Sequence, residues 1–294
     1  MNYIKNKLAV LIEQKAVSEG ITETQWPGLT LGRSNQPVPR FPLVYVPSIC
    51  IVAQGQKNVF VGDNRIIYNP LHYLIVALPM PLEAEIIKAE TDKPFLSLSL
   101  EIDISIVGKL LLEIAEEETQ PELKSIPSKA IYTSKMTKNL QNAFERLLGI
   151  LQNPVERRIL GPGIVQEILY HILKGEQGSF LRAFALRDSS SQRIAKTVRH
   201  LQKNYHQPLD VGTIAKFAGM GNSTLHHSFE KLVGQSPIQY LKKIRLHNAR
   251  LMIVSNGLNA SEAAFQVGYN NLSQFSREFK RQFGHPPSRA TEVL

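Results

Sequence analysis

The stretch "VGYNNLSQFSREFKRQFGHPP", residues 267–287, joins a glycine turn to an amphipathic, basic segment that ends at a pair of prolines. The same chain carries a related stretch, "AGMGNSTLHHSFEKLVGQSP", at residues 218–237. Beyond the glycine, each stretch repeats apolar residues at every fourth position, which predicts a helix that buries one stripe. Because glycine readily adopts the left-handed backbone that ends a helix, each glycine predicts a turn after an earlier helix. We therefore predict two helix-turn-helix units in one chain.

The two units stay in register over their whole length. Residues of the first helix and turn recur 49 positions later, and residues of the second helix recur 50 positions later, in the pairs Leu209 and Leu258, Ala215 and Ala264, Ala218 and Val267, Gly219 and Gly268, Leu225 and Phe275, Phe229 and Phe279, Gly234 and Gly284, and Pro237 and Pro287. The single extra residue falls inside the second turn, where an insertion costs least. Two copies in register favour a shared role over chance similarity.

The polar face of each second helix is a candidate to bind DNA. Short hydroxyls, imidazoles and guanidinium groups bond base edges in the major groove, and lysine and arginine suit phosphates. The predicted DNA contacts are Asn222, Ser223, Thr224, His226, His227 and Lys231 in the first copy, and Asn271, Ser273, Ser276, Arg277, Lys280 and Arg281 in the second. An ordinary solvated helix face is the alternative explanation of either copy taken alone.

The segment between the copies, "PIQYLKKIRLHNARLMIV" (residues 237–254), has apolar residues at helical spacing and is long enough to be a rigid strut. A separation of about 34 Å between the two second helices would place them in successive major grooves on one face of a duplex. Lys242 and Lys243 are expected on the outer side of this strut, where they suit the intervening phosphates.

Charge divides the chain in two. Residues 187–294 hold 15 Lys and Arg against 6 Asp and Glu, whereas residues 1–186 hold 19 of each sign, so the last 108 residues carry the whole formal net charge of +9. A neutral region joined to a basic one predicts a polyanionic partner, and favours nucleic acid over a membrane surface. No stretch resembles a signal peptide or approaches the about 20 apolar residues that cross a bilayer, so we expect a cytoplasmic protein that does not enter a membrane.

Residues 35–102 are predicted to form short antiparallel strands. In "PFLSLSLEI" (residues 94–102) leucines alternate with serines, the period of a half-buried strand, and "KNVFVGDNRIIY" (residues 57–68) has the turn residues of a hairpin. The region is punctuated by Pro37, Pro39, Pro42, Pro47, Pro70, Pro79 and Pro81. Frequent prolines favour a small antiparallel barrel or sandwich over a parallel sheet.

From residue 104 the apolar period becomes helical. The predicted helices bury Leu140, Phe144, Leu147, Leu148 and Leu151, and then Ile164, Ile168, Leu169, Ile172 and Leu173, with breaks expected at Gly149, Pro154, Gly161, Pro162 and Gly163. These helices either pack across the barrel or pair with the same helices of a second subunit, which leaves a homodimer open. The polar stretch "RDSSSQ" lies where the charge changes and predicts a linker at 187–192 between domains at 1–186 and 193–294.

Residues 192–289 resemble the paired helix-turn-helix domain of the AraC/XylS family of bacterial transcription regulators. The resemblance is carried by "LDVGTIAKFAGM", "LHHSFEKLVGQSPIQYLKKIRLHNARLMI", "SEAAFQVGY" and "QFSREFKRQFGHPPS". It implies a reader of double-stranded promoter DNA that works with RNA polymerase and is controlled by an effector domain ahead of it. Gly221 departs from the family pattern, which has a serine cap at the start of this helix, so we expect Asn222 to be the cap.

The stretch "YVPSICIVAQGQKNVFVGDNRIIYNPLHYLIVALPMPLEAEI" (residues 45–86) resembles the cupin-like N-terminal domain of one branch of that family. The resemblance implies an α+β chain, with a barrel and flanking helices followed by an all-α domain. Cupin enzymes hold a metal with several histidines, but residues 1–170 contain only His72, so we expect no metal, no cofactor and no catalytic residues. Barrel-like spacing gives the candidate effector-binding residues Tyr45, Cys50, Gln54, His72, Tyr73 and Met80.

Cys50 is the only cysteine, which excludes a disulfide framework. Two explanations of this residue stay open. It is either a small buried hydrophobe in "SICIVA" or a thiolate that a nearby cation, Lys57 or Arg65, activates toward an oxidant or electrophile.

The main prediction is a sequence-specific transcription regulator that inserts two helices into successive major grooves and is controlled by a small molecule or electrophile sensed by the barrel. The alternative is a cupin-like enzyme or a small-molecule-binding barrel whose basic domain docks a partner. A steep loss of DNA affinity with rising salt distinguishes the regulator from this alternative.

Overall fold

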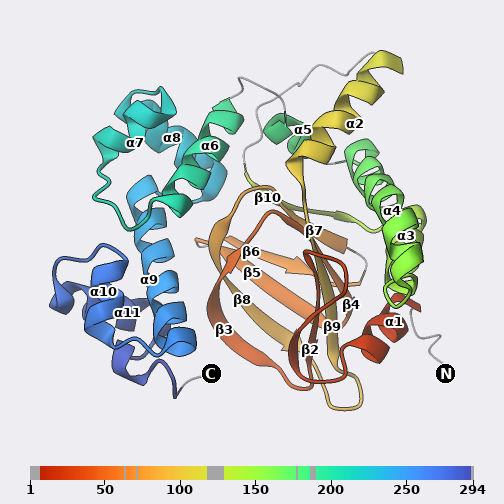
Figure 1. Ribbon diagram of the computed structural model, residues 1–294, viewed down its shortest axis with the longest axis horizontal. Helices are drawn as coiled ribbons and strands as arrows, with labels where there is room; N and C mark the ends of the chain where they lie inside the picture. The colour runs from red at the N-terminus through yellow and green to blue at the C-terminus, as the bar shows by residue number, and fades with distance from the viewer. Residues whose placement is uncertain are drawn as a thin grey trace.

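The computed structural model describes residues 7–62, 64–70, 72–117, 129–176, 178–185 and 190–292. An N-terminal region that ends at Ala185 contains β-strands with flanking helices, and a C-terminal region that begins at Ser190 is helical (Figure 1). The predicted α+β class, with strands first and an all-α domain second, is confirmed.

Two antiparallel sheets form the centre of the N-terminal region. The six-stranded sheet has the order β1 (Gly20–Glu23), β2 (Leu29–Ser34), β9 (Phe95–Glu101), β4 (Ser48–Gln54), β7 (His72–Val76), β10 (Ile131–Lys135). The four-stranded sheet has the order β3 (Val38–Tyr45), β8 (Met80–Lys88), β5 (Gln56–Val61), β6 (Asn64–Tyr68). The predicted hairpin is confirmed, because Val61 pairs with Asn64 across the turn.

The predicted barrel is therefore not a single closed sheet. β3 remains an edge strand of its sheet. Pro39 and Pro42 lie in β3 and lack the N–H groups with which a further strand could pair. The two sheets face one another, and the space between their edges opens into the interior described below.

Five helices flank the sheets, namely α1 (Lys7–Lys15), α2 (Ile104–Glu117), α3 (Lys138–Gly149), α4 (Pro154–Lys174) and α5 (Gly178–Ala185). All five contribute to one hydrophobic core with the outer face of the six-stranded sheet. In β9, Leu96, Leu98 and Leu100 belong to this core and are at most 2% exposed, as the leucine–serine alternation predicts. The expectation that the helices pack across the sheet is confirmed, and pairing with a second subunit stays a prediction.

The break predicted at Gly161, Pro162 and Gly163 is wrong, because α4 continues through all three residues. Pro162 is exposed, so its ring faces solvent. A Cβ atom at Gly161 would lie 2.0 Å from a carbon of the Trp26 ring, so glycine at this position lets the helix approach the indole closely. The sequence signal of a helix break is here a signal of close packing.

The C-terminal region contains six helices, namely α6 (Ser190–Lys203), α7 (Val211–Ala218), α8 (Asn222–Val233), α9 (Pro237–Asn256), α10 (Ala260–Gln266) and α11 (Leu272–Phe283), followed by a short 3₁₀ turn at Pro287–Arg289. We call α7 and α8 the first unit, and α10 and α11 the second unit. Gly219 and Gly268 have φ of +63° and +87°, so the left-handed turn predicted between the helices of each unit is confirmed. Of the predicted linker, residues 187–189 lie outside the described residues, and residues 190–192 already belong to α6.

The hydrophobic cores of the two units differ. The buried residues of the first unit join one continuous core with the inner faces of both sheets. The second unit has its own core around Phe275 and Phe279, together with residues of the C-terminal half of α9. The N-terminal region is thus joined to the first unit by apolar packing that the second unit does not share.

Candidate DNA-binding surface and effector cavity

Helix α8 presents its predicted contact face to solvent. The apolar stripe formed by Leu225, Phe229 and Val233 is buried. All six predicted contacts of this copy, Asn222, Ser223, Thr224, His226, His227 and Lys231, are exposed. His226 lies 3.5 Å from the carboxylate of Glu230, one helical turn later. The sequence therefore folds into an amphipathic helix whose polar side is free to meet a partner.

The expectation that Asn222 caps α8 is wrong. Gly221 is the N-cap residue, Asn222 is the first helical residue, and no side chain caps this end of the helix. Gly221 has φ of −69° and ψ of 155°, the extended backbone of an N-cap, so the chain enters the helix one residue before the asparagine. The exposed Asn222 side chain is therefore not committed to a cap.

Helix α11 repeats this arrangement with one difference. Ser273, Arg277, Lys280 and Arg281 are exposed, and Ser276 is partly buried. Asn271 is the N-cap, and its side-chain oxygen accepts a hydrogen bond from the backbone N–H of Gln274 at 2.9 Å. The side-chain oxygen of Asn271 is thus used to cap the helix, and its side-chain NH₂ group is available to bind a partner.

Helix α9 holds the two units apart. It is a straight strut of 20 residues, or about 30 Å, with the first unit at one end and the second unit at the other (Figure 1). A capping box between Ser236 and Gln239 fixes its start. Arg245 donates hydrogen bonds to the backbone oxygens of Tyr205 and Gln207, each at 2.7 Å, and ties the strut to the loop before α7.

Lys242 and Lys243 do not lie on the outer side of the strut, contrary to expectation. Both line a cavity between α9 and the four-stranded sheet. Lys242 donates a hydrogen bond of 2.7 Å to Glu278 of α11. Burial lowers the pKa of Lys243, and nearby Arg40 lowers it further while Glu83 opposes the shift. Eight of the nine residues at 238–246 are buried or partly buried, and both lysines are among them.

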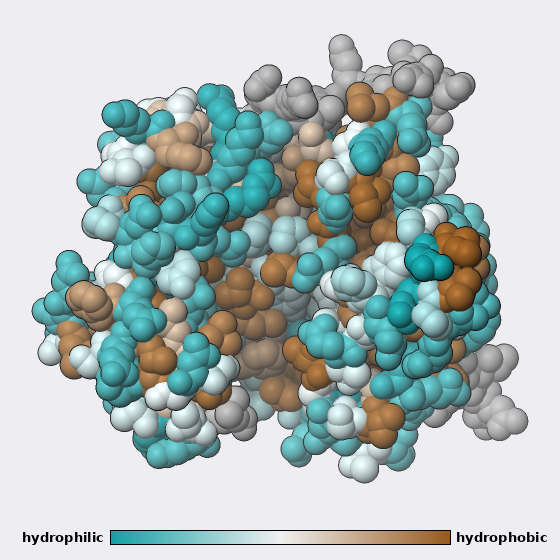
Figure 2. All heavy atoms as spheres, viewed as in Figure 1, coloured by the Kyte–Doolittle hydropathy of each residue, from teal (hydrophilic) through white to brown (hydrophobic). Residues whose placement is uncertain are grey.

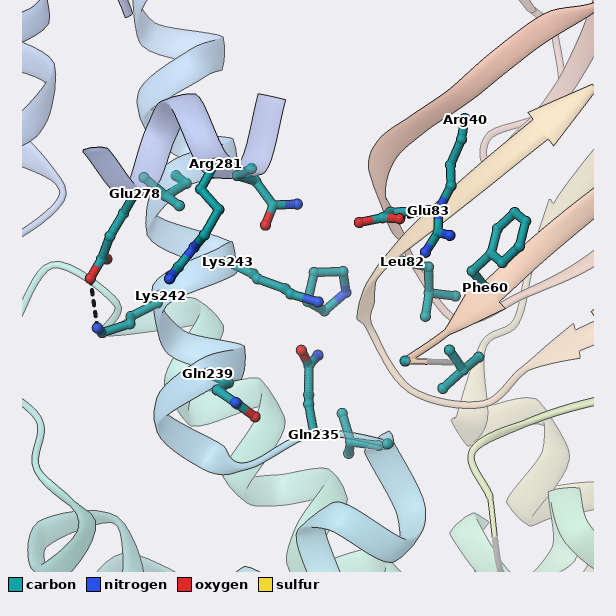
Figure 3. Close-up of a pocket in the computed structure, with 17 residues that line it drawn as sticks. Arg40, Phe60, Leu82, Glu83, Gln235, Gln239, Lys242, Lys243, Glu278 and Arg281 are labelled. Atoms are coloured by element: carbon teal, nitrogen blue, oxygen red, sulfur yellow. Dashed lines mark hydrogen bonds and ion pairs between the residues drawn. The ribbon is translucent and has the colours of Figure 1, made fainter. Parts of the chain in front are cut away.

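The cavity that they line has a volume of about 310 Å³ and lies where the N-terminal region, α9 and α11 meet (Figure 3). Arg40, Lys243 and Arg281 contribute positive charge, and Arg40 pairs with Glu83. Burial opposes ionisation of Glu278, but hydrogen bonds from Lys242, Tyr269 and Gln274 outweigh it and lower its pKa. Arg281 thus has one side toward this cavity, although its side chain stays exposed.

A larger cavity of about 650 Å³ lies inside the N-terminal region, between the two sheets. Most of its lining is apolar, with contributions from Leu31, Val38, Phe41, Leu43, Val44, Ile86, Phe95 and Leu98. Its polar lining includes Ser48, Cys50, Ser97 and Ser99 on the six-stranded sheet and Lys57 on β5, together with Glu19, Thr30, Arg33, Ser34 and Gln36 in and beside β2. We call this space the effector cavity. It is large enough for a small molecule with an apolar body.

Two tyrosines give the effector cavity its polar end. Tyr45 is 7% exposed, and its hydroxyl has no hydrogen-bond partner among the described residues. Lys57 Nζ lies 5.5 Å from the centre of the Tyr45 ring. Burial raises the pKa of Tyr68 well above its ordinary value, and neighbouring Tyr45 and Cys50 raise it further. The buried Tyr45 hydroxyl, with the Lys57 ammonium group over the same ring, suits an acceptor or anionic group of a ligand.

Of the six predicted effector residues, only Tyr45 and Cys50 line this cavity. The Gln54 side chain donates to the Pro94 oxygen at 2.8 Å, and a ring nitrogen of His72 lies 3.2 Å from the Asn69 side chain. Tyr73 belongs to the core beneath the helices, and Met80 is fully buried without reaching the cavity. The sequence analysis did not include Tyr68, Ser97 and Ser99 among the candidate effector residues, although all three line the cavity. The alternation of leucines and serines in β9 could have indicated the two serines, because it places them on the polar face of the strand.

The structure favours the buried explanation of Cys50. The residue is 4% exposed, and its sulfur lies 3.5 Å from both Ser48 Oγ and Ser99 Oγ. Among the described residues, neither Lys57 nor Arg65 lies within hydrogen-bond distance of this sulfur. The residues that the structure covers contain no group of three potential metal ligands and no helix able to span a membrane.

An apolar groove of about 480 Å³ separates β3 from α9, with Leu43, Val44 and Leu251 in its lining. Figure 2 shows an apolar hollow between the two regions, beside the hydrophilic surface of the C-terminal helices. Because Leu43 and Val44 also line the effector cavity, β3 is the wall between the two spaces.

Comparison with known proteins identifies relatives of both regions. Residues 25–180 match the family described as the AraC-type transcriptional regulator N-terminus, and residues 214–292 match a helix-turn-helix domain. The thermoregulatory protein LcrF of Yersinia pestis is 24% identical over 183 residues, which cover 62% of this chain and 65% of that protein. The lactose operon transcription activator of Staphylococcus xylosus is 25% identical over 160 residues, or 54% of this chain and 57% of that protein. The chain thus spans less than two thirds of the length of these relatives.

The fold is also that of ToxT from Vibrio cholerae. One ToxT structure matches with a TM-score of 0.60 at 13% identity and covers 90% of this chain and 98% of its own. A second, of ToxT bound to an unsaturated fatty acid, matches with a TM-score of 0.59 at 12% identity over 93% of this chain and 98% of its own. At this identity the likeness establishes a common architecture of sheets, helices and paired helix-turn-helix units.

Proposed function

The chain belongs to the AraC family of transcriptional regulators, and from this premise we propose that it reads promoter DNA with α8 and α11 in two successive major grooves. The premise rests on the family match to residues 25–180, which is more than half of the chain. The observation that carries the proposal is the exposure of two equivalent polar helix faces near the ends of one 20-residue strut. That strut spans about 30 Å, close to the about 34 Å that separates successive major grooves on one face of a duplex.

Each side chain has a role that its chemistry sets. Ser223 and His227 of α8, and Ser273 and Arg277 of α11, are proposed to contact base edges. Lys231, Lys280 and Arg281 are proposed to contact phosphates. Lys242 and Lys243 are not included, since they face the N-terminal region in this arrangement.

Electrophoretic mobility shift and footprinting with the full chain test this proposal. Promoter fragments from the neighbourhood of the gene provide the first probes, and the footprint defines the bipartite site. Neutralisation of about 5 to 8 phosphates predicts a steep linear fall of log affinity with log salt between 50 and 200 mM. A flat salt response, or equal affinity for the bipartite site and a scrambled duplex, would overturn the proposal.

The proposed partners follow from this role. A regulator of promoters acts in the cytoplasm beside RNA polymerase, and we assign it binding rather than catalysis. A homodimer through the helices of the N-terminal region remains part of the proposal, and sedimentation of the full chain with and without its DNA site measures it.

We propose that the effector is an amphipathic acid held in the effector cavity. ToxT structures contain an unsaturated fatty acid and (E)-4-(8-methylnaphthalen-1-yl)but-3-enoic acid, both of which join an apolar body to a carboxylate. In this chain the apolar lining suits such a body, and Lys57 with the unpaired Tyr45 hydroxyl suits the carboxylate.

Titration calorimetry with oleate tests the effector assignment, with oleyl alcohol as the uncharged control ligand. Lys57→Met keeps the length of the side chain and removes its charge, so it should weaken oleate binding and leave the alcohol unaffected. Arg65→Met, at an exposed position of the same hairpin, is the matched control variant. Equal loss of both ligands in Lys57→Met, or no saturable binding of oleate, would contradict the proposed ligand class.

A further inference from the structure

The N-terminal region grips the turn that joins α8 to α9. Three of its parts meet this turn: Ala130, directly before β10, the tip of the β5–β6 hairpin, and the connection from β7 to β8. The contacts involve residues 232–240, which include the last turn of α8, the helix proposed to read the first half of the DNA site. This grip contains both a backbone and a side-chain hydrogen bond between the two regions.

The first contact is a continuous pair of backbone hydrogen bonds. Ala77, directly after β7, donates its N–H to the Ala130 oxygen at 2.8 Å, and Ala130 donates its own N–H to the Leu232 oxygen at 2.7 Å. Leu232 lies in the last turn of α8, where backbone carbonyls have no partner within the helix. Ala130 is fully buried and Leu232 is 3% exposed. The N-terminal region thus supplies the C-terminal cap of this helix from outside.

The other contacts fix the turn on either side of this bond. Gly234 ends α8 with φ of +76°, and a Cβ atom there would lie 2.5 Å from a methyl carbon of Val61 at the hairpin tip. Tyr240 of α9 is fully buried and donates its hydroxyl to the Pro79 oxygen at 3.0 Å. Its ring also packs edge to face with Phe229 of α8, with 5.6 Å between ring centres. Movement of either segment of the N-terminal region therefore acts directly on α8.

The second unit has no equivalent connection. Glu278, Arg281 and Gln282 of α11 face the N-terminal region across the polar cavity of Figure 3. Within the described ranges, no hydrogen bond joins α10 or α11 to the N-terminal region. The second unit also keeps a separate hydrophobic core. Among the residues that the structure covers, α11 therefore lies beside β3 without a hydrogen bond or a shared hydrophobic core that would transmit a displacement of the N-terminal region.

One sheet connects the effector cavity to this grip. Ser48 and Cys50 of β4 line the cavity, and they pair with Val76 and Leu74 of β7. The residue after Val76 is Ala77, which begins the hydrogen-bond chain to Leu232. Two adjacent strands therefore lead from the wall of the cavity to the end of α8.

We propose that the N-terminal region controls DNA binding through the first unit alone. The hydrogen bonds from Ala77 through Ala130 to Leu232, and from Tyr240 to Pro79, hold α8 in a fixed orientation. Helix α11 binds its half-site independently of these bonds. This inference rests on the proposed function, since it concerns how the two proposed readers are regulated. It makes the two halves of a bipartite site differ in their dependence on the N-terminal region.

The test measures binding of the full chain by fluorescence anisotropy to three duplexes: the bipartite site, and two versions with one half scrambled. His227→Ala and Arg277→Ala identify the half-sites read by α8 and α11. Tyr240→Phe removes only the hydroxyl that bonds Pro79, and Ala130→Pro removes the N–H that caps α8. Each should weaken binding to duplexes that keep the α8 half-site by about two- to tenfold, the equivalent of one net hydrogen bond. Neither should change affinity for the duplex with only the α11 half-site.

Matched variants separate this effect from loss of stability. Tyr269→Phe removes a buried tyrosine hydroxyl that donates to Glu278 inside the second unit, so it should weaken only the α11 half-site. Leu74→Ala loosens β7, whereas Leu29→Ala loosens β2 in the core beneath the helices, away from the grip and from the lining of the effector cavity, so only the former should affect the α8 half-site. Circular dichroism confirms that each variant is folded, and Tyr240→Phe decides the matter if Ala130→Pro does not fold.

Equal changes at both half-sites in Tyr240→Phe, or no change at either, would overturn the inference. A wild-type chain that fails to prefer the bipartite site over scrambled DNA would instead overturn the proposed function, before any variant is compared. The two failures are therefore distinguishable in one set of titrations.

Discussion

Replacing Gly234 by alanine should cost much more stability than replacing Gly284, its equivalent in the second unit. Both glycines end a recognition helix in the left-handed region, with φ of +76° and +81°. Alanine in this region costs about 1 to 2 kcal/mol, and both variants carry that cost. At Gly284 a new Cβ atom meets nothing within 4 Å, whereas at Gly234 it lies 2.5 Å from Val61 Cγ1. Overpacking of this kind adds about 1 to 3 kcal/mol, so Gly234→Ala should cost about 2 to 5 kcal/mol in total.

Urea unfolding measures both variants, with two probes. Trp26 is the only tryptophan and lies in the N-terminal region beside α4, so its fluorescence follows that region, and circular dichroism follows the helices. Val61→Ala removes the methyl groups that the new Cβ would meet. In the Gly234→Ala background it should therefore recover part of the lost stability, although alone it should destabilise the chain.

Equal losses of stability in Gly234→Ala and Gly284→Ala would refute the reasoning. Contact with the N-terminal region would then add nothing to the cost of alanine at position 234. Absence of coupling between positions 61 and 234 would refute it independently. Either result would mean that the hairpin tip does not pack against the α8–α9 turn in solution.

Three further predictions concern single side chains. Burial lowers the pKa of His247 to about 4, so the unfolded chain binds a proton more readily than the folded chain. The free energy of unfolding should therefore fall by up to about 3 kcal/mol as the pH drops from about 6.5 toward 4. Urea unfolding across this pH range should show a smaller fall in His247→Gln. Asn271→Ala removes the cap of α11 and should cost about 1 kcal/mol, whereas Asn222→Ala removes no cap and should leave the unfolding midpoint nearly unchanged. Arg277→Ala should cost about 1 to 3 kcal/mol of DNA binding and relax base preference at one half-site, and equal weakening on all sequences would assign Arg277 to a phosphate instead.

The helical half of the fold could be predicted because its signals are local. Apolar residues four apart specify each buried stripe, and Gly219 and Gly268 specify each turn through their backbone conformation. The same reasoning placed the hairpin at residues 62–64 and the two faces of β9. It failed at Gly161, where the neighbour that makes glycine necessary is Trp26, a residue 135 positions away in sequence. A local pattern cannot tell a helix break from a close contact with a distant ring.

The candidate effector site was harder to predict for a related reason. Alternation along a strand shows which residues share a face, but not which face lines a cavity. Tyr45 and Cys50 lie on the cavity side, whereas Tyr73 lies on the opposite face of its sheet, beneath the helices. The predicted orientation of Lys242 and Lys243 was wrong because it assumed that their side of α9 faces solvent. The N-terminal region covers that side of the helix.

The duplication itself indicates why regulation acts on one unit. Two equivalent units that a strut holds about 30 Å apart do not pack against one N-terminal region in the same way, because only the first unit shares its hydrophobic core with the sheets. The first unit, which follows α6 in the chain, packs against the sheets and has no separate core. Phe229 and Tyr240 belong to the same hydrophobic core as the sheets. The other unit keeps Phe275 and Phe279 as a core of its own. Two DNA-binding units attached to one N-terminal region are therefore unequal. In the proposed arrangement the N-terminal region regulates binding to one half-site, and the second unit binds the other half-site whatever the state of that region.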